Sequence, residues 1–385
     1  MKLTAYSDIL HALEEEGRFR KFPSPPANER FIDLTSNDYM GLGRKSAEYI
    51  EEFRDSFGYV PMSASASRLL ASNQGIFRKL EGFLEDSYGK PAILFNSGYH
   101  ANVGLVSCLN IPSTLWLTDK LIHASVIDGI RMAKAQFVRW PHNDTKTLRE
   151  IIDKNRPLYQ RIIIVCESVY SMDGDIAPLE ELLQIRDEYP EVMLYVDEAH
   201  AVGCFGPRGL GLCMDKSSGN FPDILVGTLG KACASYGAFV IADSILKDYI
   251  VNTSRPLIFS TAIPPVCAAW SLFMLEKLAA MDEERKRLHD LSHRFRKSVE
   301  SITGRNNPSR SAIVPLITGS SEKAVALSKA LEHRGIVALP IRRPTVPPGG
   351  ERIRFSLNAC LGDEELTYIE GSLKDLIQDE NRIFS

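Results

Sequence analysis

The sequence predicts an α/β protein built on a largely parallel β-sheet of seven strands, followed by a smaller α+β domain. Between residues 90 and 245, short apolar runs alternate with amphipathic stretches of helix length. Strands that alternate with helices in this way form parallel sheets that helices cover on both faces. The seven strand candidates are 92–98, 115–120, 137–140, 161–170, 192–200, 224–231 and 237–242.

The last two strand candidates differ from the others because only a few residues separate them. A connection this short cannot hold a crossover helix, so we expect 237–242 to be an antiparallel partner. After about residue 261 the pattern changes to a long helical run over 264–302. A strand, a helix, two further strands (336–342 and 352–359) and a final helix follow, which predicts a small α+β domain. We therefore expect a helical arm and linker (1–45), a large domain (46–265), and a connecting helix with the small domain (266–385).

The N-terminal 22 residues predict an amphipathic helix, because four apolar side chains fall on one stripe at helical spacing: Leu3, Ile9, Leu10 and Leu13. The basic residues at its end, among them Arg18 and Arg20, can be explained as a solvated helix terminus that complements the dipole. Residues 23–30 are proline-rich and predict a break. A short strand and a turn follow, in which Asn37 either makes only turn hydrogen bonds or faces a ligand.

The composition excludes several classes of protein. The chain has 385 residues, 44% of them apolar and 24% charged, and a net charge of −4. Without a basic stripe, neither nucleic acid nor an anionic membrane is expected as a partner. Seven cysteines without a CxxC pair favour free thiols in a reducing compartment, and no metal site is expected. We expect a cytoplasmic protein, because no signal peptide and no run of 18 apolar residues is present.

Two apolar runs in the middle of the chain each end in ionisable side chains. The first run ends in Asp197, Glu198 and His200, and the second is followed by Lys231. The spacing of Asp197 and Lys231 corresponds to one strand–crossover–strand unit of about 30 residues. Right-handed crossovers would bring both groups to the same carboxyl edge of the sheet, where open α/β sheets bind their ligands.

A lysine and an acid at this edge suit a cofactor that carries an aldehyde on a pyridine ring. The lysine can form a Schiff base with the aldehyde, and the acid can partner the ring nitrogen. Thr228 precedes Lys231 by three residues, and its hydroxyl could reach a phosphate. A lysine at an apolar strand end can have the lowered pKa that an amine nucleophile needs. A single lysine there would be a surface residue by default, but the whole group favours the cofactor interpretation.

Other strand ends could contribute polar groups, although each has a simpler explanation. The backbone amides of Gly98 and Tyr99 at a helix start could bind a phosphate, or they could belong to an ordinary turn. Tyr99 or His123 could place a flat ring near the same edge, although a single histidine is more often a surface or core residue. Ser171 could hydrogen-bond a ligand, while the residues after it could form only a turn.

Two nucleotide-binding interpretations of this region are poorly supported. The sequence VDEAH resembles a helicase-type Walker B motif, which requires a preceding phosphate loop ending in GK[ST]. The only GK, Gly230-Lys231, comes after it, has Leu225 in place of the first glycine and is followed by Ala232. The spaced glycines of 203–211 open no helix, so a dinucleotide site is also weakly supported.

Taken together and in order, eight motifs resemble the α-oxoamine synthases, which are fold-type-I pyridoxal-phosphate enzymes. The resemblance runs from about Asn37 to Phe355 and implies an acyltransferase that condenses an amino acid with an acyl-CoA and releases CO2. L-Alanine and pimeloyl-CoA are the expected pair; the alternatives are glycine with acetyl- or succinyl-CoA, and a serine palmitoyl type. The motifs are SNDYMGL, FNSGYHANVG, DKLIHASVIDG, ESVYSMDGDIAPL, VDEAHAVGCFGPRGLG, GTLGKA, FSTAIPP and RRPTVPPGGERIRFS.

The resemblance implies a role for each matching residue around the ring of pyridoxal 5'-phosphate. Lys231 would form the internal aldimine, and Asp197 would keep the pyridine nitrogen protonated. His200 would hydrogen-bond the ring hydroxyl, and His123 would stack on the face of the ring. Ser171 would also contact the cofactor.

The resemblance also implies how the phosphate is bound. The amides of Gly98 and Tyr99 would bind it together with Thr228. Ser260 and Thr261 would reach the phosphate of a neighbouring subunit, so a homodimer is expected.

For the substrates, the matching family positions are Asn37, Arg342 and Thr345. Arg342 suits a carboxylate because its guanidinium can bind both oxygens. Arg20, rather than Arg18, is our choice for the N-terminal arginine that contacts substrate. The alternative from another functional class is a binding subunit without catalytic activity. The presence of Lys231 counts against it.

The sequence departs from the family at three places. The glycine-rich segment appears as 61–73, with Arg68 kept and several glycines replaced by Ser or Ala. Phe77 stands where a histidine is common, and 356–360 replaces a run of small residues that ends in histidine. These positions line or support the acyl-CoA side, so they concern the acyl chain rather than the chemistry.

Overall fold

The computed structural model describes residues 3–22, 31–72, 74–214 and 221–380. Its contacts divide the chain into two compact units. The larger unit comprises Asp38–Ser171 and Ile176–Lys286, and the smaller comprises Met1–Asn37, Met172–Asp175 and Arg287–Ser385.

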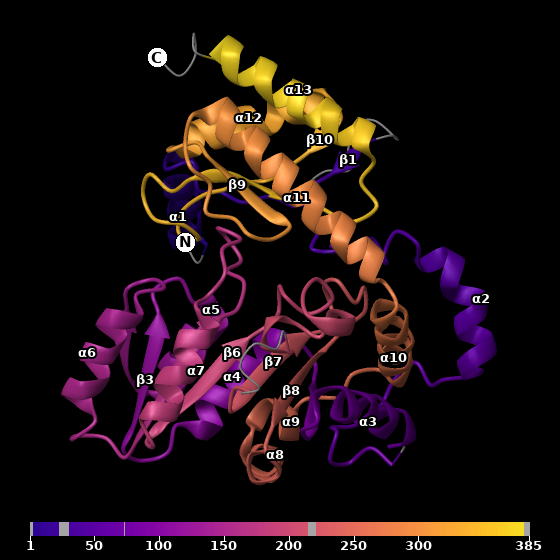
Figure 1. Ribbon diagram of the computed structural model, residues 1–385, viewed down its shortest axis with the longest axis vertical. Coiled ribbons are helices and arrows are strands. Elements are labelled where there is room, and N and C mark those ends of the chain that lie inside the picture. The colour runs from indigo at the N-terminus through magenta and orange to yellow at the C-terminus, as the bar shows by residue number, and fades with distance from the viewer. Residues whose placement is uncertain (1–2, 23–30, 73, 215–220, 381–385) are drawn as a thin grey trace. The chain divides into compact units, whose positions relative to one another are not determined.

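The larger unit contains a seven-stranded sheet with the order β2-β8-β7-β6-β5-β3-β4 (Figure 1). The pairs from β7 through β4 are parallel, whereas β8 is antiparallel to both β7 and β2. The expected antiparallel partner is thereby confirmed, as is the mainly parallel sheet. The strands are β2 (Ala92–Phe95), β3 (Thr114–Asp119), β4 (Gln136–Trp140), β5 (Arg161–Glu167), β6 (Val192–Asp197), β7 (Ile224–Thr228) and β8 (Ala238–Ala242).

Helices cover both faces of this sheet. Because side chains alternate along a strand, β5 and β6 send Val165 and Tyr195 into one core and Ile164 and Leu194 into the other. The first core also receives α4, α5, α8 and α9, and the second receives α6 and α7. The helices are α2 (Ser46–Phe57), α3 (Gly75–Tyr88), α4 (Gly98–Leu109), α5 (Ala124–Ala133), α6 (Thr145–Asn155), α7 (Leu179–Glu188), α8 (Ser244–Thr253), α9 (Arg255–Phe259) and α10 (Pro265–Ala279), with short 3-10 turns at Pro207–Gly209 and Leu212–Met214.

The domain boundaries that the sequence predicts, after residues 45 and 265, stay predictions. By contacts, the larger unit also takes in residues 266–286, because α10 packs against α3 and α2. The long helical run expected over 264–302 is in fact two helices. The amides of Ala280 and Met281 bond to carbonyls three residues back and end α10. The next helix, α11 (Asp282–Thr303), begins with three acidic residues that favour a helix N-terminus.

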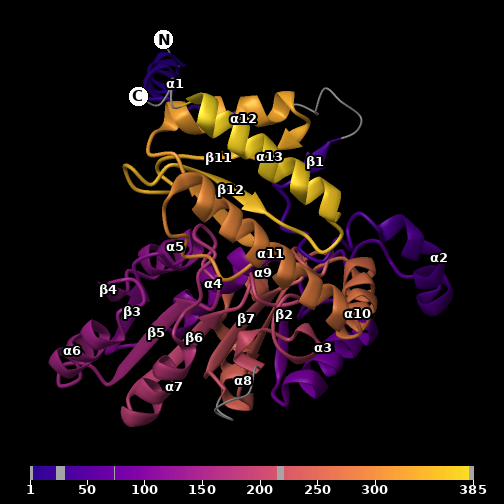
Figure 2. The same cartoon turned by 45° about the horizontal axis from the view of Figure 1, so that its top comes forward.

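The smaller unit is an α+β structure, as expected (Figure 2). It has a three-stranded antiparallel sheet, β11-β12-β9, and a separate parallel pair, β1-β10. The single strand expected over 336–342 is divided between the two sheets, because the chain leaves the first sheet at Ala338, whose carbonyl accepts from Ser328 Oγ. The elements are α1 (Thr4–Glu15), β1 (Ile32–Asp33), most of α11, β9 (Ile313–Ile317), α12 (Ser321–His333), β10 (Ile336–Val337), β11 (Pro340–Ile341), β12 (Arg352–Ser356) and α13 (Asp363–Glu380).

The N-terminal arm forms a shorter helix than expected. The predicted helix over residues 1–22 is α1, which ends at Glu15, ahead of Gly17 in the left-handed region at φ +64°. The apolar stripe is largely exposed, with Leu3 at 75% and Ile9 at 57%. The proline-rich stretch 23–30 lies outside the described residues.

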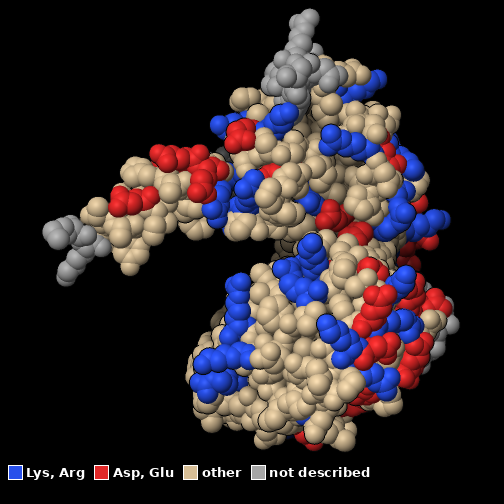
Figure 3. Space-filling model, turned by 90° about the vertical axis from the view of Figure 1, so that its left-hand side faces the viewer, with Lys and Arg blue, Asp and Glu red and all other residues tan. Residues whose placement is uncertain are grey.

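The surface is of mixed charge. On the face of the larger unit that Figure 3 shows, Lys and Arg gather on the left, and acidic and basic side chains lie interspersed on the right. Among the described residues, no helix is long and apolar enough to cross a membrane. All seven cysteines are described, and all are free thiols.

One glycine of the smaller unit allows a close backbone approach. Gly174 has φ +69°, and a Cβ atom there would overlap the carbonyl oxygen of Ile313 and lie 2.9 Å from Ser309 Oγ. Its own carbonyl accepts from the amide of Arg310. The segment 172–175 is therefore held against the loop before β9 at a distance that only glycine permits.

Replacing Gly174 by alanine should lower the free energy of unfolding by about 2–4 kcal/mol, because left-handed strain of about 1–3 kcal/mol adds to a backbone clash. Gly304→Ala is the matched control, since Gly304 has φ +65° and no atom within 4 Å of a Cβ. Denaturant unfolding of both variants measures the difference. Equal losses would show that the contact with Ile313 is unimportant.

Candidate active site

The carboxylate of Asp197 is buried at the carboxyl end of β6. Its side chain is 5% exposed, and each oxygen has a donor. Asn102 Nδ2 donates to Oδ2 at 2.8 Å, and the amide of Ala199 donates to Oδ1 at 2.9 Å. Two donors satisfy a carboxylate that is held away from water, so Asp197 is suited to remain an anion.

A chain of buried hydrogen bonds links Asp197 to His123. Asn102 Nδ2 also donates to Ser125 Oγ at 2.9 Å, and Ser125 Oγ lies 2.7 Å from His123 Nδ1. The Oδ1 atom of Asn102 accepts from the Tyr195 hydroxyl at 2.5 Å. Asn102, which is 1% exposed, therefore fixes the acid and the imidazole relative to one another.

The sequence did not identify Asn102, Ser125 or Tyr195 as site residues. Asn102 lies inside one of the quoted motifs, and it is a polar side chain in α4, where most residues are buried and apolar. A polar residue within an apolar helix was the one available signal, because a buried amide must find partners.

The protonation states of the ring and the phenol follow from their surroundings. Partial desolvation lowers the pKa of His123 from its ordinary 6.5, against the opposing effect of Asp197. The imidazole is therefore neutral at pH 7. Burial raises the pKa of Tyr195 well above its usual value, with a smaller contribution from Asp197, so the phenol keeps the proton that it donates to Asn102.

Lys231 follows β7 and lies against a second histidine. Its Nζ is 2.7 Å from His200 Nε2, and His200 Nδ1 is 2.7 Å from the hydroxyl of Tyr39. When Lys231 is an ammonium ion, Nε2 accepts and Nδ1 carries the proton toward Tyr39. Tyr39 is 1% exposed. It thus sets the orientation of His200, a role that the sequence did not reveal.

The beginning of α4 offers backbone amides to an anion. Ser97 caps this helix by accepting from the amide of His100 at 3.2 Å. The amides of Gly98 and Tyr99 belong to the first turn, where no carbonyl of the helix can accept from them. Apart from its chain neighbours and the helix backbone, no atom of the described residues lies within 4 Å of a Cβ built on Gly98. The helix start is therefore open on the side of Gly98 where a side chain would stand.

Thr228 ends β7 and holds the loop that carries Lys231. Its hydroxyl donates to the carbonyl of Gly237 and accepts from the amide of Gly230, both at 3.3 Å. These bonds are long, so they leave the hydroxyl able to exchange a backbone partner for a ligand.

Ser260 and Thr261 lie after α9 and are tied to the end of β2. Asn96 Nδ2 donates to Ser260 Oγ at 3.1 Å and to the carbonyl of Thr261 at 2.7 Å. Thr261 also forms a bridge with Ser67. The described residues 61–72 of the segment that departs from the family are thus joined to this part of the larger unit through Ser67.

Arg68 and Phe77 have structural partners. The guanidinium of Arg68 bonds to Glu81 at 2.8 Å and lies 4.7 Å from the centroid of the Phe77 ring. Phe77 is fully buried. The phenylalanine that replaces a common histidine therefore serves as a core residue beneath Arg68.

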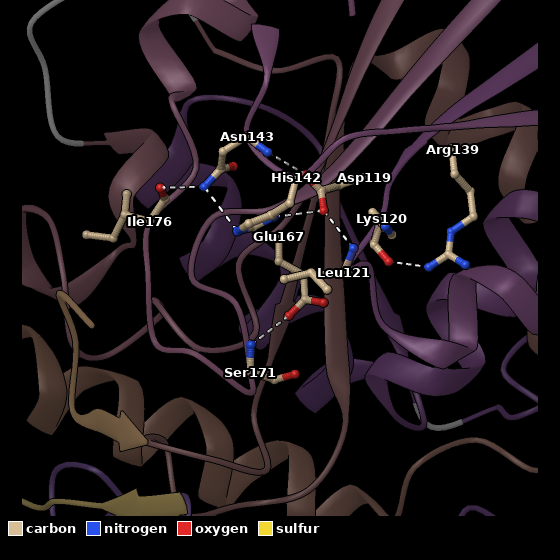
Figure 4. A network of polar contacts seen from close by, with 9 residues as sticks. All are labelled: Asp119, Lys120, Leu121, Arg139, His142, Asn143, Glu167, Ser171 and Ile176. Atoms are coloured by element: carbon tan, nitrogen blue, oxygen red, sulfur yellow. Dashed lines mark hydrogen bonds and ion pairs between the residues drawn. The ribbon is translucent and has the colours of Figure 1, made fainter. Parts of the chain in front are cut away.

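Ser171 lies next to a group of buried polar side chains (Figure 4). Its amide donates to Glu167 Oε2 at 3.2 Å. Close by, Asp119 accepts from the amide of Leu121 at 2.7 Å and contacts His142 Nδ1 at 2.9 Å. The turn after β3, which leads to His123, is anchored in this way.

The expected substrate residues belong to the smaller unit. Arg342 donates to the carbonyls of Gly17 at 2.6 Å and Phe19 at 3.3 Å. Arg20 Nη2 donates to Thr345 Oγ1 at 3.0 Å. The structure therefore brings Arg20, Arg342 and Thr345 together through the N-terminal arm.

Asn37 and Arg18 have other partners within this unit. Asn37 Oδ1 accepts from Arg354 Nη2 at 3.1 Å, so Asn37 is held by β12. Arg18 pairs with Glu16 at 2.6 Å.

The residues of the larger unit fit a phosphorylated pyridine aldehyde. An anionic carboxylate, a lysine amine, two imidazoles and a helix start with open space are the groups that such a molecule requires. The described residues contain no group of three or more side chains suited to a metal ion.

Comparison with known proteins agrees with this fit. The model of the family "Aminotransferase class I and II" matches residues 29–373, and the chain belongs to this family. The 8-amino-7-oxononanoate synthase of Haemophilus ducreyi is 44% identical over 352 residues, with 88% of this chain and 90% of that protein covered.

Two solved structures cover nearly the whole fold. Serine palmitoyltransferase from S. paucimobilis, with a bound PLP–myriocin aldimine, superposes with a TM-score of 0.85 at 27% identity, covering 98% of both chains. The 8-amino-7-oxononanoate synthase from Francisella tularensis gives 0.76 at 26% identity, covering 92% of this chain and 100% of that one. Both are α-oxoamine synthases, and this chain is likewise a pyridoxal-phosphate-dependent acyltransferase of that type.

Replacing Asn102 by alanine should lower the free energy of unfolding by about 2–4 kcal/mol, because several buried groups lose their partner. Asn252→Ala is the control, since Asn252 makes a 2.7 Å bond to the Asp248 carbonyl on an exposed helix face and should cost less than about 0.5 kcal/mol. Unfolding is measured on cofactor-free protein. If Asn102→Ala lost no more unfolding free energy than Asn252→Ala, the stabilising role of the hydrogen-bond network would be contradicted.

Proposed function

We propose that this enzyme condenses L-alanine with pimeloyl-CoA and forms 8-amino-7-oxononanoate, CoA and CO2, a step of biotin synthesis. The observation that carries the proposal is the sheet edge of the larger unit, where Asp197 and Lys231 follow adjacent strands. The relative from Haemophilus ducreyi, named 8-amino-7-oxononanoate synthase, supports the choice of reaction.

Pyridoxal phosphate supplies an electron sink that stabilises negative charge on the Cα atom of an amino acid. In the proposed site, Asp197 holds a proton on the ring nitrogen, and Asn102 and the Ala199 amide keep its carboxylate anionic. His123 stacks on the ring as a neutral imidazole. His200 would hydrogen-bond the ring hydroxyl through Nε2, with Tyr39 at its Nδ1 atom, and Ser171 would make a further contact.

Lys231 has two tasks in the proposal. Its amine would hold the cofactor covalently in the resting enzyme. As a free amine, Lys231 would be the base that takes the proton from Cα of the substrate, and it would later return a proton to the product. The contact of 2.7 Å with His200 Nε2 supports this, because a fixed neighbour keeps the amine oriented after its release.

For the phosphate we propose the amides of Gly98 and Tyr99 and the hydroxyl of Thr228. Ser260 and Thr261 would reach the phosphate of a second copy of the chain. Exposed apolar side chains on the segments that adjoin these residues support a homodimer, since exposed apolar surface is typical of interfaces. They are Met62 (72% exposed), Leu70 (79%) and Phe259 (70%).

For the substrates we propose Asn37, Arg342, Thr345 and Arg20. Arg342 would bind the carboxylate of the amino acid with its planar fork. Two backbone carbonyls already hold this guanidinium, which supports a fixed position for it. Because CO2 is lost only after the new bond has formed, the carboxylate must stay bound until then.

The test is a CoA-release assay on cofactor-loaded protein, in which alanine, glycine and serine are crossed with pimeloyl-, acetyl-, succinyl- and palmitoyl-CoA. We expect turnover with alanine and pimeloyl-CoA to exceed every other pair at least tenfold. Lys231→Ala should reduce it by at least a thousandfold, because the base and the covalent link are both lost.

Lys277→Ala is the matched control, since Lys277 lies on α10 and pairs with Glu52. Preferred turnover of another pair would assign this enzyme to another member of the family. No turnover despite bound cofactor would favour a silent binding subunit.

The contacts of the arm predict which arginine serves the substrate. Arg20→Ala should raise the KM of one substrate about tenfold, as expected when charge-assisted hydrogen bonds of about 1.5–3 kcal/mol are lost. Arg18→Ala should change both KM values less than twofold, because Arg18 pairs with Glu16. Steady-state kinetics on both variants gives the comparison, and the opposite ranking would reverse the assignment.

A further inference from the structure

Three buried carboxyl groups end three neighbouring strands of the larger unit. Asp119 ends β3, Glu167 ends β5 and Asp197 ends β6, and these strands are adjacent in the sheet. Their exposed fractions are 0%, 3% and 5%. Three negative charges so close together in the interior would repel one another. The hydrogen-bond donors around each group decide which of them is charged.

Asp119 and Asp197 have donors for both of their oxygens. Asp119 accepts from two backbone amides and contacts the ring of His142 (Figure 4). Asp197 accepts from Asn102 and from the Ala199 amide. Both carboxylates are therefore compensated as anions.

Glu167 has fewer hydrogen-bond donors than Asp119 and Asp197. Its Oε2 atom accepts from the amide of Ser171 at 3.2 Å, as Figure 4 shows. Its Oε1 atom is buried and has no hydrogen-bond partner among the described residues. In the parallel register Glu167 is the direct partner of Asp197, so the two side chains leave the same face of the sheet. When two such acids share one site, the one with fewer donors keeps the proton.

We propose that Glu167 is a neutral carboxylic acid in the folded protein and acts as a positioning residue for the cofactor site. Its Oε2 atom holds the backbone at Ser171, and its neutrality leaves Asp197 as the anion on this face of the sheet. The neutral state of Glu167 is independent of the proposed function. Its role in positioning the cofactor site rests on the proposed role of Asp197.

The surrounding charges agree with a neutral Glu167. Burial, followed by the nearby Asp197, raises the pKa of Glu167 to about 8, with a smaller contribution from Asp119. Lys231 and the Ser171 amide act in the opposite direction without cancelling this effect.

The other titratable neighbours add no charge at neutral pH. Burial raises the pKa of Cys166 and of Tyr170 well above their usual values, so the thiol and the phenol are neutral. His123, the N-cap residue of α5, is neutral as well because partial desolvation lowers its pKa.

The first test needs no cofactor. Because the folded pKa lies above the unfolded value of 4.5, the folded state binds one more proton than the unfolded state between about pH 5 and pH 8. Stability from this group is therefore lost as pH rises through that window. Compared with Glu167→Gln, the unfolding equilibrium constant of the wild type should rise by up to about tenfold per pH unit, and then level off above pH 8.

Glu150→Gln, at an exposed position of α6, is the control and should show no such trend. A constant ratio between wild type and Glu167→Gln from pH 5 to pH 8 would overturn the neutral state of Glu167. Because apoprotein is used, this outcome does not depend on whether the proposed reaction is correct.

The second test separates positioning from packing. Glu167→Met keeps the size of the side chain but removes the acceptor for Ser171, so we expect pyridoxal phosphate to dissociate at least tenfold more readily at pH 7. Glu167→Gln restores a neutral acceptor and should recover at least fivefold of that loss. Dissociation is followed by the absorbance of the bound cofactor. If Gln and Met were equally impaired, an ionised Glu167 would be required and the proposal would fail.

Discussion

A buried carboxylate at the end of β6 is the constraint on which the site depends. An unpaired charge in the interior would cost several kcal/mol or take up a proton. Asp197 avoids both because Asn102 and the amide of Ala199 each occupy one of its oxygens. Asn102 can do so because α4 packs on β2, β7 and β8 of the sheet, so the packing of the fold supplies a donor to the acid that we propose as the partner of the ring nitrogen.

Helix α4 contributes to the site in two ways. Its first turn presents amides and open space beside Gly98, and one turn further on its Asn102 reaches both Asp197 and Ser125. Ser125 in turn fixes His123 at the N-cap of α5. One helix therefore sets the relative positions of an anion site, an acid and an imidazole.

Much of this arrangement could be predicted from the sequence. The spacing of Asp197 and Lys231, together with the right-handed crossover rule, placed them at one edge of a parallel sheet. The antiparallel strand at 237–242 followed from its short connection. Both predictions rest on local chain geometry, which the order of apolar runs records directly.

Other features depend on contacts between distant residues, and no local pattern records them. The hydroxyl of Tyr39 and Nδ1 of His200 lie 2.7 Å apart although 161 residues separate them in sequence, and Tyr195 of β6 donates to Asn102 of α4, 93 residues away. The division of 336–342 between two sheets falls at Ala338, whose carbonyl accepts from Ser328 in α12. The sequence placed an apolar stripe on α1, and in the structure Leu3, Ile9 and Leu10 of that stripe are exposed.

The central claim is that Lys231, at the end of β7, binds pyridoxal phosphate covalently. Borohydride reduction of the cofactor-loaded protein, followed by peptide mapping with mass spectrometry, tests it directly. A single reduced adduct on the peptide that contains Lys231 is the expected result. An adduct on another lysine, or none in a protein with bound cofactor, would contradict the account.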